Sequence, residues 1–391
     1  MKIAIVVSHP IQHFCPMYAS WAKNINVKLK VFFASNLGVQ PYEDENFARQ
    51  IKWGNLYLDE FEHEFLNGVE TVQINKNLDA PNLIVNLLDF SPDLIIQYGR
   101  IYKFNKRLRN WIKTTNIKSA YISDSENRHS HSFLKLLFKK LFFSFYFKKF
   151  DLFLTVGDAN ENFYRSCGVP ESKILRMNFS IDVKHFYLCY LNREKLRKEL
   201  RGDLKIANGD LVISVVGKLV SWKCQIDLIS LLLEIERLSD WPKFHLVIAG
   251  SGPDESILRK EAAKLRINEV HFLGFVDPME LPKVYSASDV YIHPSKFEPH
   301  SLAVSEAIYM GLPVIVSHTS GSYGKTDDVR EGENGFVYQC GNTFDLKEKL
   351  EILVNPLVRD EMGEMSRNIA VEAQNISHND VLLKLGGILN K

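Results

Sequence analysis

The stretch PSKFEPHSLAVSEAIYMGLPVIVS, residues 294–317, has the pattern of a turn, a helix and a strand. Pro299 suits the turn before a helix, and Ser301 suits the N-cap or the first turn. The spacing predicts a helix over Leu302–Met310, and the apolar run Pro313–Ser317 predicts a short buried strand. A helix feeding directly into a buried strand is typical of an α/β domain.

Two glutamates flank the start of this helix. Glu298 stands at its entrance, and Glu306 lies about two turns into it. The backbone N–H groups of His300–Leu302 are expected to be free at the helix N-terminus, which would make them an anion site for a phosphate. Two carboxylates beside a phosphate suit a sugar nucleotide, because ribose and hexose offer pairs of hydroxyl donors. The spacing alone favours two solvated glutamates on a surface helix.

The same alternation of strands and helices extends outward through the whole chain. The expected strands are Lys2–Ser8, Val27–Ala34, Leu94–Tyr98, Ser119–Ser123, Leu152–Val156, Leu211–Val216, Phe244–Ala249, Val270–Leu273, Val290–His293 and Pro313–Ser317. Continuous apolar strands alternating with helices indicate parallel sheets covered on both faces. The fold class is therefore α/β, with two Rossmann-like doubly wound domains.

The domain boundary is expected in a charged segment without strands, at about 181–208. We predict an N-terminal domain over 1–185, a C-terminal domain over 186–365 and a helical tail over 366–391. The tail is expected to pack back across the junction. A chain of 391 residues is comfortable for two such cores.

Composition excludes several classes of protein. The net charge of +1 provides no global field for nucleic acid. The five cysteines are scattered without a C-x-x-C pair, so neither a disulfide framework nor a zinc site is predicted, and a reducing cytoplasm fits. No apolar run reaches the length of about 18 residues that a spanning helix needs. A dehydrogenase is excluded because no G-x-G-x-x-G follows the first strand.

Residues 294–317 resemble the signature of retaining glycosyltransferases of family four (glycosyl transferases group 1), which have the GT-B fold. The family pattern runs Pro-Ser, Glu-Pro, an aromatic-Gly pair, Glu-Ala and Gly-Leu-Pro-Val. The resemblance implies that Glu306 binds the ribose and that Glu298 contacts hydroxyls of the transferred sugar. His300-Ser301 stands where the aromatic-Gly pair is usual, which puts the phosphate geometry in doubt. The resemblance covers the C-terminal domain and extends more weakly into the N-terminal one.

Further segments match the family's donor side. In VGKLVSWKC, residues 216–224, Lys218 and Lys223 stand where two cations hold the donor diphosphate, although Lys218 replaces an arginine and Cys224 a glycine. AGSGP (249–253) and LGFV (273–276) resemble loops that form the cleft walls. The predicted donor-binding residues are Lys218, Lys223, Gly250, Gly252, Phe275, Glu298, His300, Ser301, Leu302 and Glu306.

The acceptor side is expected in the N-terminal domain. The run SHPIQH after the first strand contributes His9, Gln12 and His13. The run DSENRH, 124–129, follows another strand, where relatives place a polar residue facing the anomeric carbon. Asp124 is the best match by position, with Glu126 and His129 as rivals. The predicted catalytic residues are Asp124, Glu298 and Lys223.

The predicted function is metal-independent, retaining transfer of a hexose-type sugar from a nucleoside diphosphate sugar to a saccharide or lipid-linked acceptor. Bacterial surface polysaccharide biosynthesis is the expected setting, and no cofactor is expected besides the donor. A GT-B sugar-nucleotide epimerase and a non-catalytic sugar-nucleotide-binding protein remain as alternatives.

Residues 133–150 have two opposite apolar faces on a helical wheel. Leu136, Phe143, Phe147 and Phe150 form one face, and Leu134, Phe138, Leu141 and Phe145 form the other. Five lysines lie between the faces. A helix packed on a sheet needs only one apolar face, so the second is predicted to dock in the plane of a membrane, with the lysines towards lipid phosphates. The alternative is a helix buried on both sides by protein.

Overall fold

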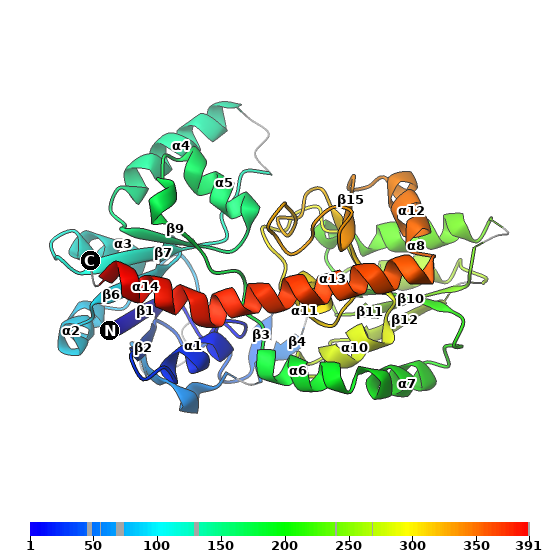
Figure 1. Cartoon of the computed structure of the whole chain (residues 1–391), viewed down its shortest axis with the longest axis horizontal. Coiled ribbons are helices and arrows are strands. Elements are labelled where there is room, and N and C mark those ends of the chain that lie inside the picture. Colours follow the sequence, from blue (N-terminus) through cyan, green and yellow to red (C-terminus); the bar gives the residue numbers. More distant parts are fainter. Residues whose placement is uncertain are drawn as a thin grey trace.

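Two α/β domains lie side by side in the computed structural model of the chain, each with a parallel sheet between layers of helices (Figure 1). The structure describes residues 1–391 except 45–48, 55, 68–73, 129–132, 239–240, 268 and 390–391. The expected fold class is confirmed.

The N-terminal sheet has seven parallel strands in the order β5-β2-β1-β6-β7-β8-β9. Its strands are β1 Lys2–Val7, β2 Lys28–Phe33, β5 Glu62–Phe65, β6 Leu94–Tyr98, β7 Lys118–Ile122, β8 Leu152–Thr155 and β9 Ile174–Arg176. The helices around it are α1 Cys15–Ala22, α2 Leu83–Phe90, α3 Lys103–Ile112, α4 Phe133–Phe147 and α5 Asp158–Ser166. An antiparallel hairpin, β3 Tyr42–Asp44 and β4 Arg49–Ile51, projects from this domain.

The C-terminal sheet has six parallel strands in the order β12-β11-β10-β13-β14-β15. Its strands are β10 Leu211–Val216, β11 Phe244–Ala249, β12 Glu269–Gly274, β13 Val290–His293, β14 Val314–Ser317 and β15 Gly335–Tyr338. Its helices are α8 Gln225–Ile235, α9 Glu255–Ala262, α10 Leu281–Ala287, α11 Leu302–Tyr309 and α12 Thr343–Ile352. Central strands such as β10 are buried along their whole length, as continuous apolar runs predict.

All ten strands expected from the sequence are present. The sequence analysis missed β5, β9, β15 and the β3–β4 hairpin. β5 reads EHEF and alternates charged residues with others, so no apolar run marks it. β9 has only three residues, and β15 only four. Such short strands are stabilised mainly by pairing with the neighbouring strand of the sheet. Their own few residues therefore do not predict them.

The segment between the domains is helical. It forms α6 Val183–Leu191 and α7 Arg193–Asp203, and α7 packs on α10 of the C-terminal domain. Arg197 and Arg201 each reach one oxygen of Asp289 at 2.6 Å. The predicted boundary at 185–186 falls inside α6.

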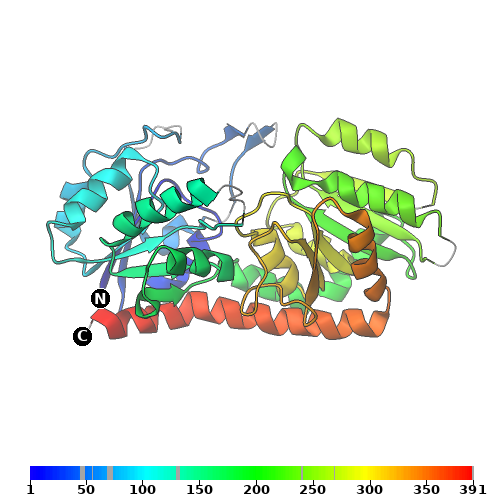
Figure 2. The ribbon, with the colours of Figure 1, turned by 90° about the horizontal axis from the view of Figure 1, so that it is seen from above.

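The C-terminal tail crosses back to the N-terminal domain, as expected. It consists of α13 Pro356–Asn375, a π-helical segment Ile376–Asp380 and α14 Val381–Leu389, and Figure 2 shows it running along both domains. Trp21 Nε1 donates to the Ser377 carbonyl at 3.0 Å, and Leu385 is buried in the N-terminal core. The crossing helix starts at Pro356, so the predicted tail boundary at 366 lies within α13.

Candidate functional site

A cleft between the two domains gathers most of the predicted residues. It lies beyond the carboxyl ends of strands from both sheets, where open α/β sheets bind ligands. Its wall combines residues from the N-terminal domain, the linker and the C-terminal domain: Gln12, His13, Trp53, Tyr98, Asp124, Phe179, Asp182, His185, Gly217, Lys218, Lys223, Met279, Glu298, His300, Ser301, Leu302, Ala303 and Glu306.

Glu298 lies in the loop between β13 and α11. Its backbone carbonyl accepts from Gly321 N at 2.7 Å, and a Cβ on Gly321 would lie 1.5 Å from the Pro299 carbonyl oxygen. Only glycine therefore permits this loop contact. The Glu298 carboxylate bonds Lys223 Nζ and lies 3.3 Å from His293 Nε2. Burial would raise the pKa of Glu298, but Lys223 and His293 together lower it to about 2.

Glu306 has the opposite electrostatic environment. It is buried inside α11, and its Oε2 accepts from the Tyr285 hydroxyl at 2.8 Å. Burial raises the pKa of Glu306 to about 8, and the hydrogen bond from Tyr285 offsets this effect only in part. At neutral pH one glutamate of the pair is ionised and the other is largely protonated, although both belong to one short motif.

Both predicted diphosphate lysines are paired with carboxylates. Lys218 follows β10, and its Nζ lies 3.2 Å from each carboxylate oxygen of Asp44, in the hairpin of the other domain. Lys223 ends a 3₁₀ turn, Ser221–Lys223, and pairs with Glu298. A diphosphate bound here would compete with carboxylates for both cations.

Ser301 is the N-cap of α11, as predicted, but its backbone N–H is not free. It donates to Ser322 Oγ at 2.7 Å, so that part of the expected anion site is wrong. His300 stands where the family pattern has an aromatic residue. Its ring packs edge-on against the Phe179 ring, with 4.8 Å between the ring centroids, and its Nε2 lies 3.1 Å from Asp327 Oδ1. Burial lowers the pKa of His300, and Asp327 and Asp328 raise it above the usual value. His300 therefore joins the two domains at the cleft floor.

Three of the predicted acceptor-side residues line the cleft: Asp124, Gln12 and His13. Burial raises the pKa of Asp124, which follows β7. Burial, reinforced by His9 and His300, lowers the pKa of His13 to about 3, so the ring is neutral. His13 Nε2 is buried without a hydrogen-bond partner. A neutral imidazole with an unpaired nitrogen suits hydrogen bonding to a hydroxyl ligand.

Two other acceptor-side candidates lie behind the wall. His9 Nδ1 bonds Ser8 Oγ at 2.8 Å, and Glu126 accepts from the Arg128 backbone N–H. Arg128 in turn bonds the Tyr323 carbonyl at 2.8 Å, joining the domains. These positions indicate that His9 and Glu126 support the loops after β1 and β7 and do not contact a ligand. The third candidate, His129, lies outside the described residues.

The glycines after β11 are required by backbone contact. A Cβ on Gly250 would lie 1.8 Å from the Gly217 carbonyl oxygen, and one on Gly252 would lie 2.4 Å from that of Leu219. Close packing of the β10 and β11 loops explains both glycines. Phe275 follows β12 and is half-buried. A donor contact by these three residues stays a prediction.

The sequence analysis missed several residues of the site. Phe179, Asp182 and His185 come from the linker, and Trp53 and Tyr98 come from the N-terminal domain. His293, at the end of the strand VYIH, was the most detectable, because polar residues at strand ends face the ligand edge. No local sequence pattern marks Tyr285 as a site residue, because it reaches Glu306 only through the tertiary contact between α10 and α11.

Three groups of side chains in the described part of the chain have a spacing that could hold a metal ion: Cys224–Asp227–Cys340, His245–Glu269–His271 and His300–Asp327–Asp328. In the second group, His245 bonds His271 at 2.9 Å and Asp210 at 2.8 Å, so its ring nitrogens are satisfied. In the third, Asp327 is engaged by His300 and by the Asp158 N–H at 2.7 Å.

Comparison with known proteins places part of the chain in a family. Residues 197–369 match the family Glycosyl transferases group 1. An alpha-monoglucosyldiacylglycerol synthase of Acholeplasma laidlawii is 26% identical over 240 residues, which is 56% of each chain. The chain spans about half the length of the curated relatives it matches.

Solved structures share the whole architecture. A glycosyltransferase from Rickettsia africae superposes with a TM-score of 0.71 at 16% identity, covering 99% of this chain and 98% of the other. Anabaena HepE in complex with UDP and glucose superposes with a TM-score of 0.68 at 16% identity, covering 99% and 100%. At this identity the likeness establishes the fold, which is that of two-domain glycosyltransferases.

Proposed function

We propose that this protein is a GT-B glycosyltransferase of family four. It would move a hexose-type sugar, with retention, from a nucleoside diphosphate sugar to a saccharide or lipid-linked acceptor. One observation carries the proposal: Lys218, Lys223, Glu298, Glu306 and Asp124 all line one cleft between two Rossmann-like domains. The family match and the fold shared with a UDP-bound structure support it.

The proposed chemistry follows from the charges in the cleft. Departure of the nucleoside diphosphate develops negative charge on phosphate, which Lys218, Lys223 and the N–H groups at the start of α11 other than that of Ser301 would stabilise. The sugar becomes cation-like, and Asp124 would stabilise it or orient the acceptor. In a front-face reaction the acceptor oxygen bonds the anomeric carbon, the bond to the leaving phosphate breaks, and that phosphate takes the acceptor's proton.

The donor is tested with a panel of nucleoside diphosphates and their sugars. A ligand that binds only the folded state raises the melting temperature in proportion to the logarithm of its concentration. The true donor is expected to give the largest shift, and products made with and without acceptor are then compared. Altered sugar nucleotide without acceptor would identify an epimerase, and binding without any product would identify a non-catalytic sugar-nucleotide-binding protein.

Transfer is expected to be independent of divalent metal. The two lysines supply the charge that a metal would otherwise supply, and Asp327 is committed to His300. The rate measured in EDTA should equal the rate measured with magnesium or manganese. Loss of transfer in EDTA, restored by either ion, would contradict this mechanism.

We further propose that α4 docks on a membrane surface, which suits a lipid-linked acceptor in surface polysaccharide assembly. Of the two faces on the helical wheel, one packs inward, with Phe143 and Phe147 buried. The other is exposed: Leu134, Phe138, Leu141 and Phe145 are 64%, 69%, 50% and 66% accessible. In the described part of the chain no helix has the length and apolarity to span a bilayer. In-plane docking fits such a face.

Wild-type protein is expected to sediment with anionic liposomes at low salt. Changing Phe138, Leu141 and Phe145 together to serine should release it, because the apolar contact with the lipid is lost. The control changes Val85 and Leu88 of α2 to serine; both are 58% exposed, and binding should persist. If wild type stays in the supernatant, or if both variants behave alike, α4 does not dock on lipid.

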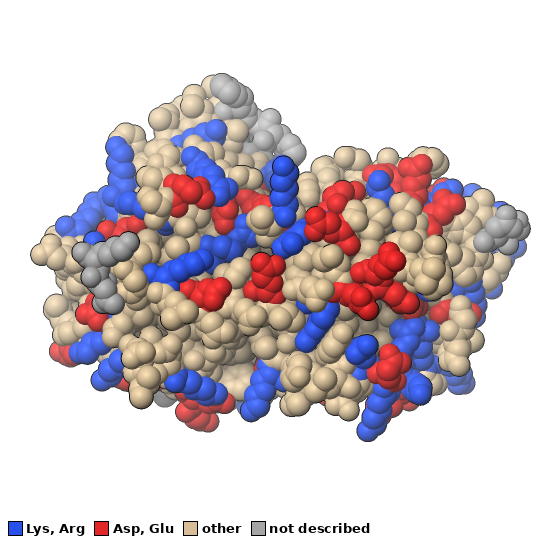
Figure 3. Space-filling model, in the orientation of Figure 1, with Lys and Arg blue, Asp and Glu red and all other residues tan. Residues whose placement is uncertain are grey.

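On the face seen in Figure 3, cationic and anionic side chains are interspersed. This face therefore offers no single-sign field for nucleic acid, in keeping with the net charge of +1. We propose that the enzyme is cytoplasmic and binds peripherally to the inner face of the cell membrane.

A further inference from the structure

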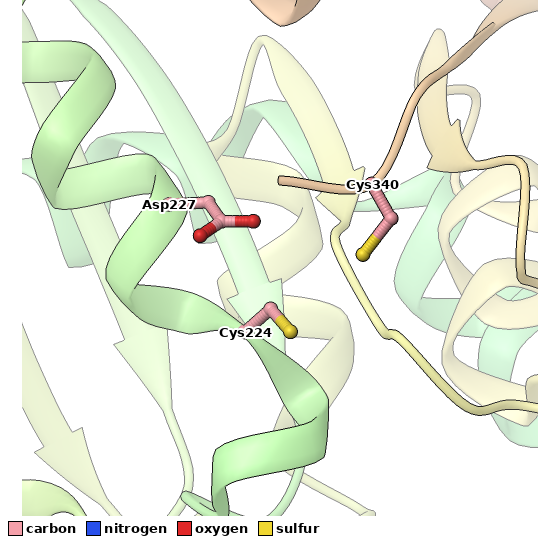
Figure 4. A group of neighbouring side chains, drawn as sticks. All are labelled: Cys224, Asp227 and Cys340. Atoms are coloured by element: carbon pink, nitrogen blue, oxygen red, sulfur yellow. The ribbon is translucent and has the colours of Figure 1, made fainter. Parts of the chain in front are cut away.

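Three metal-ligating side chains meet beside the donor-binding loop, on residues that have no role in the proposed transfer. Cys224 is the N-cap of α8, Asp227 lies in the first turn of that helix, and Cys340 follows β15. Figure 4 shows the Cys340 sulfur pointing towards Cys224 and Asp227. One ligand atom from each residue lies within 4.8 Å of the other two, and both cysteines are free thiols.

The two thiols have weak partners in the protein, with Cys224 Sγ 3.5 Å from the Ser221 carbonyl and Cys340 Sγ 3.7 Å from the Pro294 carbonyl, but one oxygen of the cluster is left unsatisfied. Asp227 Oδ2 is buried without a partner, as is the hydroxyl of nearby Tyr338. An unsatisfied buried oxygen destabilises the fold, and a cation between the thiols and Asp227 would satisfy the Asp227 oxygen.

The backbone also favours a built site. Cys224 has a left-handed conformation (φ 54°, ψ 32°), which a non-glycine residue adopts at a cost. The Cys224 thiol lies in one cluster with the Cys340 thiol (Figure 4). A thiol that has lost its proton is a ligand for a soft cation.

We propose that Cys224, Cys340 and Asp227 bind one thiophilic divalent cation of the Zn²⁺ class, with the fourth position open to water. Two thiolates and a carboxylate form a tetrahedral set that suits Zn²⁺ and leaves one position free. Binding transfers the remaining thiol protons to the buffer. The ion would tie the start of α8, directly after Lys223, to the end of β15. It would act as a clip and take no part in sugar transfer.

Cobalt(II) is the probe, because thiolate ligation gives it a charge-transfer band in the near ultraviolet and tetrahedral geometry gives intense visible bands. Reduced, tag-free, full-length protein is expected to develop both signals, saturating at one equivalent, and Zn²⁺ should abolish them. Absence of the charge-transfer band at one equivalent would overturn the proposal. The readout needs no substrate, so it stands or fails separately from the proposed transferase activity.

Single substitutions test the ligand set. Cys340→Ala and Cys224→Gly should each weaken Co²⁺ binding at least 100-fold, and Asp227→Asn at least tenfold. Glycine suits the left-handed backbone at 224, so that variant should fold at least as well as wild type. Cys189→Ala, a half-buried cysteine elsewhere, is the matched control and should bind normally.

Thermal stability provides a second readout. Zn²⁺ should raise the melting temperature of wild type and of Cys189→Ala, and leave that of Cys340→Ala unchanged. An equal shift in all three proteins would place the ion elsewhere and refute this site.

Discussion

Glu298→Gln is expected to abolish sugar transfer while the folded protein still binds the free nucleoside diphosphate. Glutamine keeps the size of the side chain but removes the charged acceptor for the hydroxyls of the transferred sugar, so kcat/KM should fall at least 10²–10³-fold. Glutamine is preferred to alanine because Lys223 would otherwise lose its partner in a buried site. Nucleotide affinity should be retained or increased, since Lys223 is no longer neutralised by a carboxylate.

Calorimetry with the nucleoside diphosphate and a turnover assay separate the two effects. Glu306→Ala is the complementary variant and should weaken free-nucleotide binding by roughly 1–3 kcal/mol, because the ribose hydroxyls lose a buried hydrogen-bond partner. Glu331→Gln is the control and should transfer sugar normally, because Glu331 is an exposed glutamate that accepts from the Val337 N–H and lies outside the cleft wall. Equal loss of nucleotide affinity in Glu298→Gln and Glu306→Ala would refute the division of labour.

Glu306→Gln is expected to become progressively more stable than wild type as the pH rises. Burial raises the pKa of Glu306 from 4.5 to about 8, so the folded state holds a proton that the unfolded state releases. The stability linked to this proton is fully present below about pH 4.5 and is lost as the pH rises through 8. Glutamine cannot ionise and escapes the loss.

The expected size is large. Between pH 5.5 and pH 9 the difference in free energy of unfolding, variant minus wild type, should grow by roughly 3 kcal/mol. Urea denaturation at the two pH values measures it, with exposed Glu348→Gln as a control that should show no such trend. A difference that is flat with pH would show that Glu306 ionises normally in the fold.

The sequence by itself determined the ten apolar strands and where their ligand edge lies, but not the short or charged strands. Runs such as LVISVV in β10 are apolar without interruption, and such strands are stable only when both faces of a parallel sheet are covered. The spacing of Glu298 and Glu306 around Ser301 likewise fixed a helix start between two carboxylates, because capping and helical periodicity act within a few residues. The two faces of α4 were also predictable from periodicity alone.

Only the tertiary structure decided what each group touches. Glu298 and Glu306 belong to the same short motif, yet their pKa values shift in opposite directions. Lys223 lowers the pKa of Glu298, whereas burial raises the pKa of Glu306. The Ser301 N–H, predicted to be free, is bound by Ser322, which reaches it from a loop about twenty residues away. Cys224 and Cys340 lie far apart in the chain, so no local spacing could indicate that their thiols meet. Desolvation and long-range pairing depend on the packed fold, whereas local sequence specifies only the elements that pack.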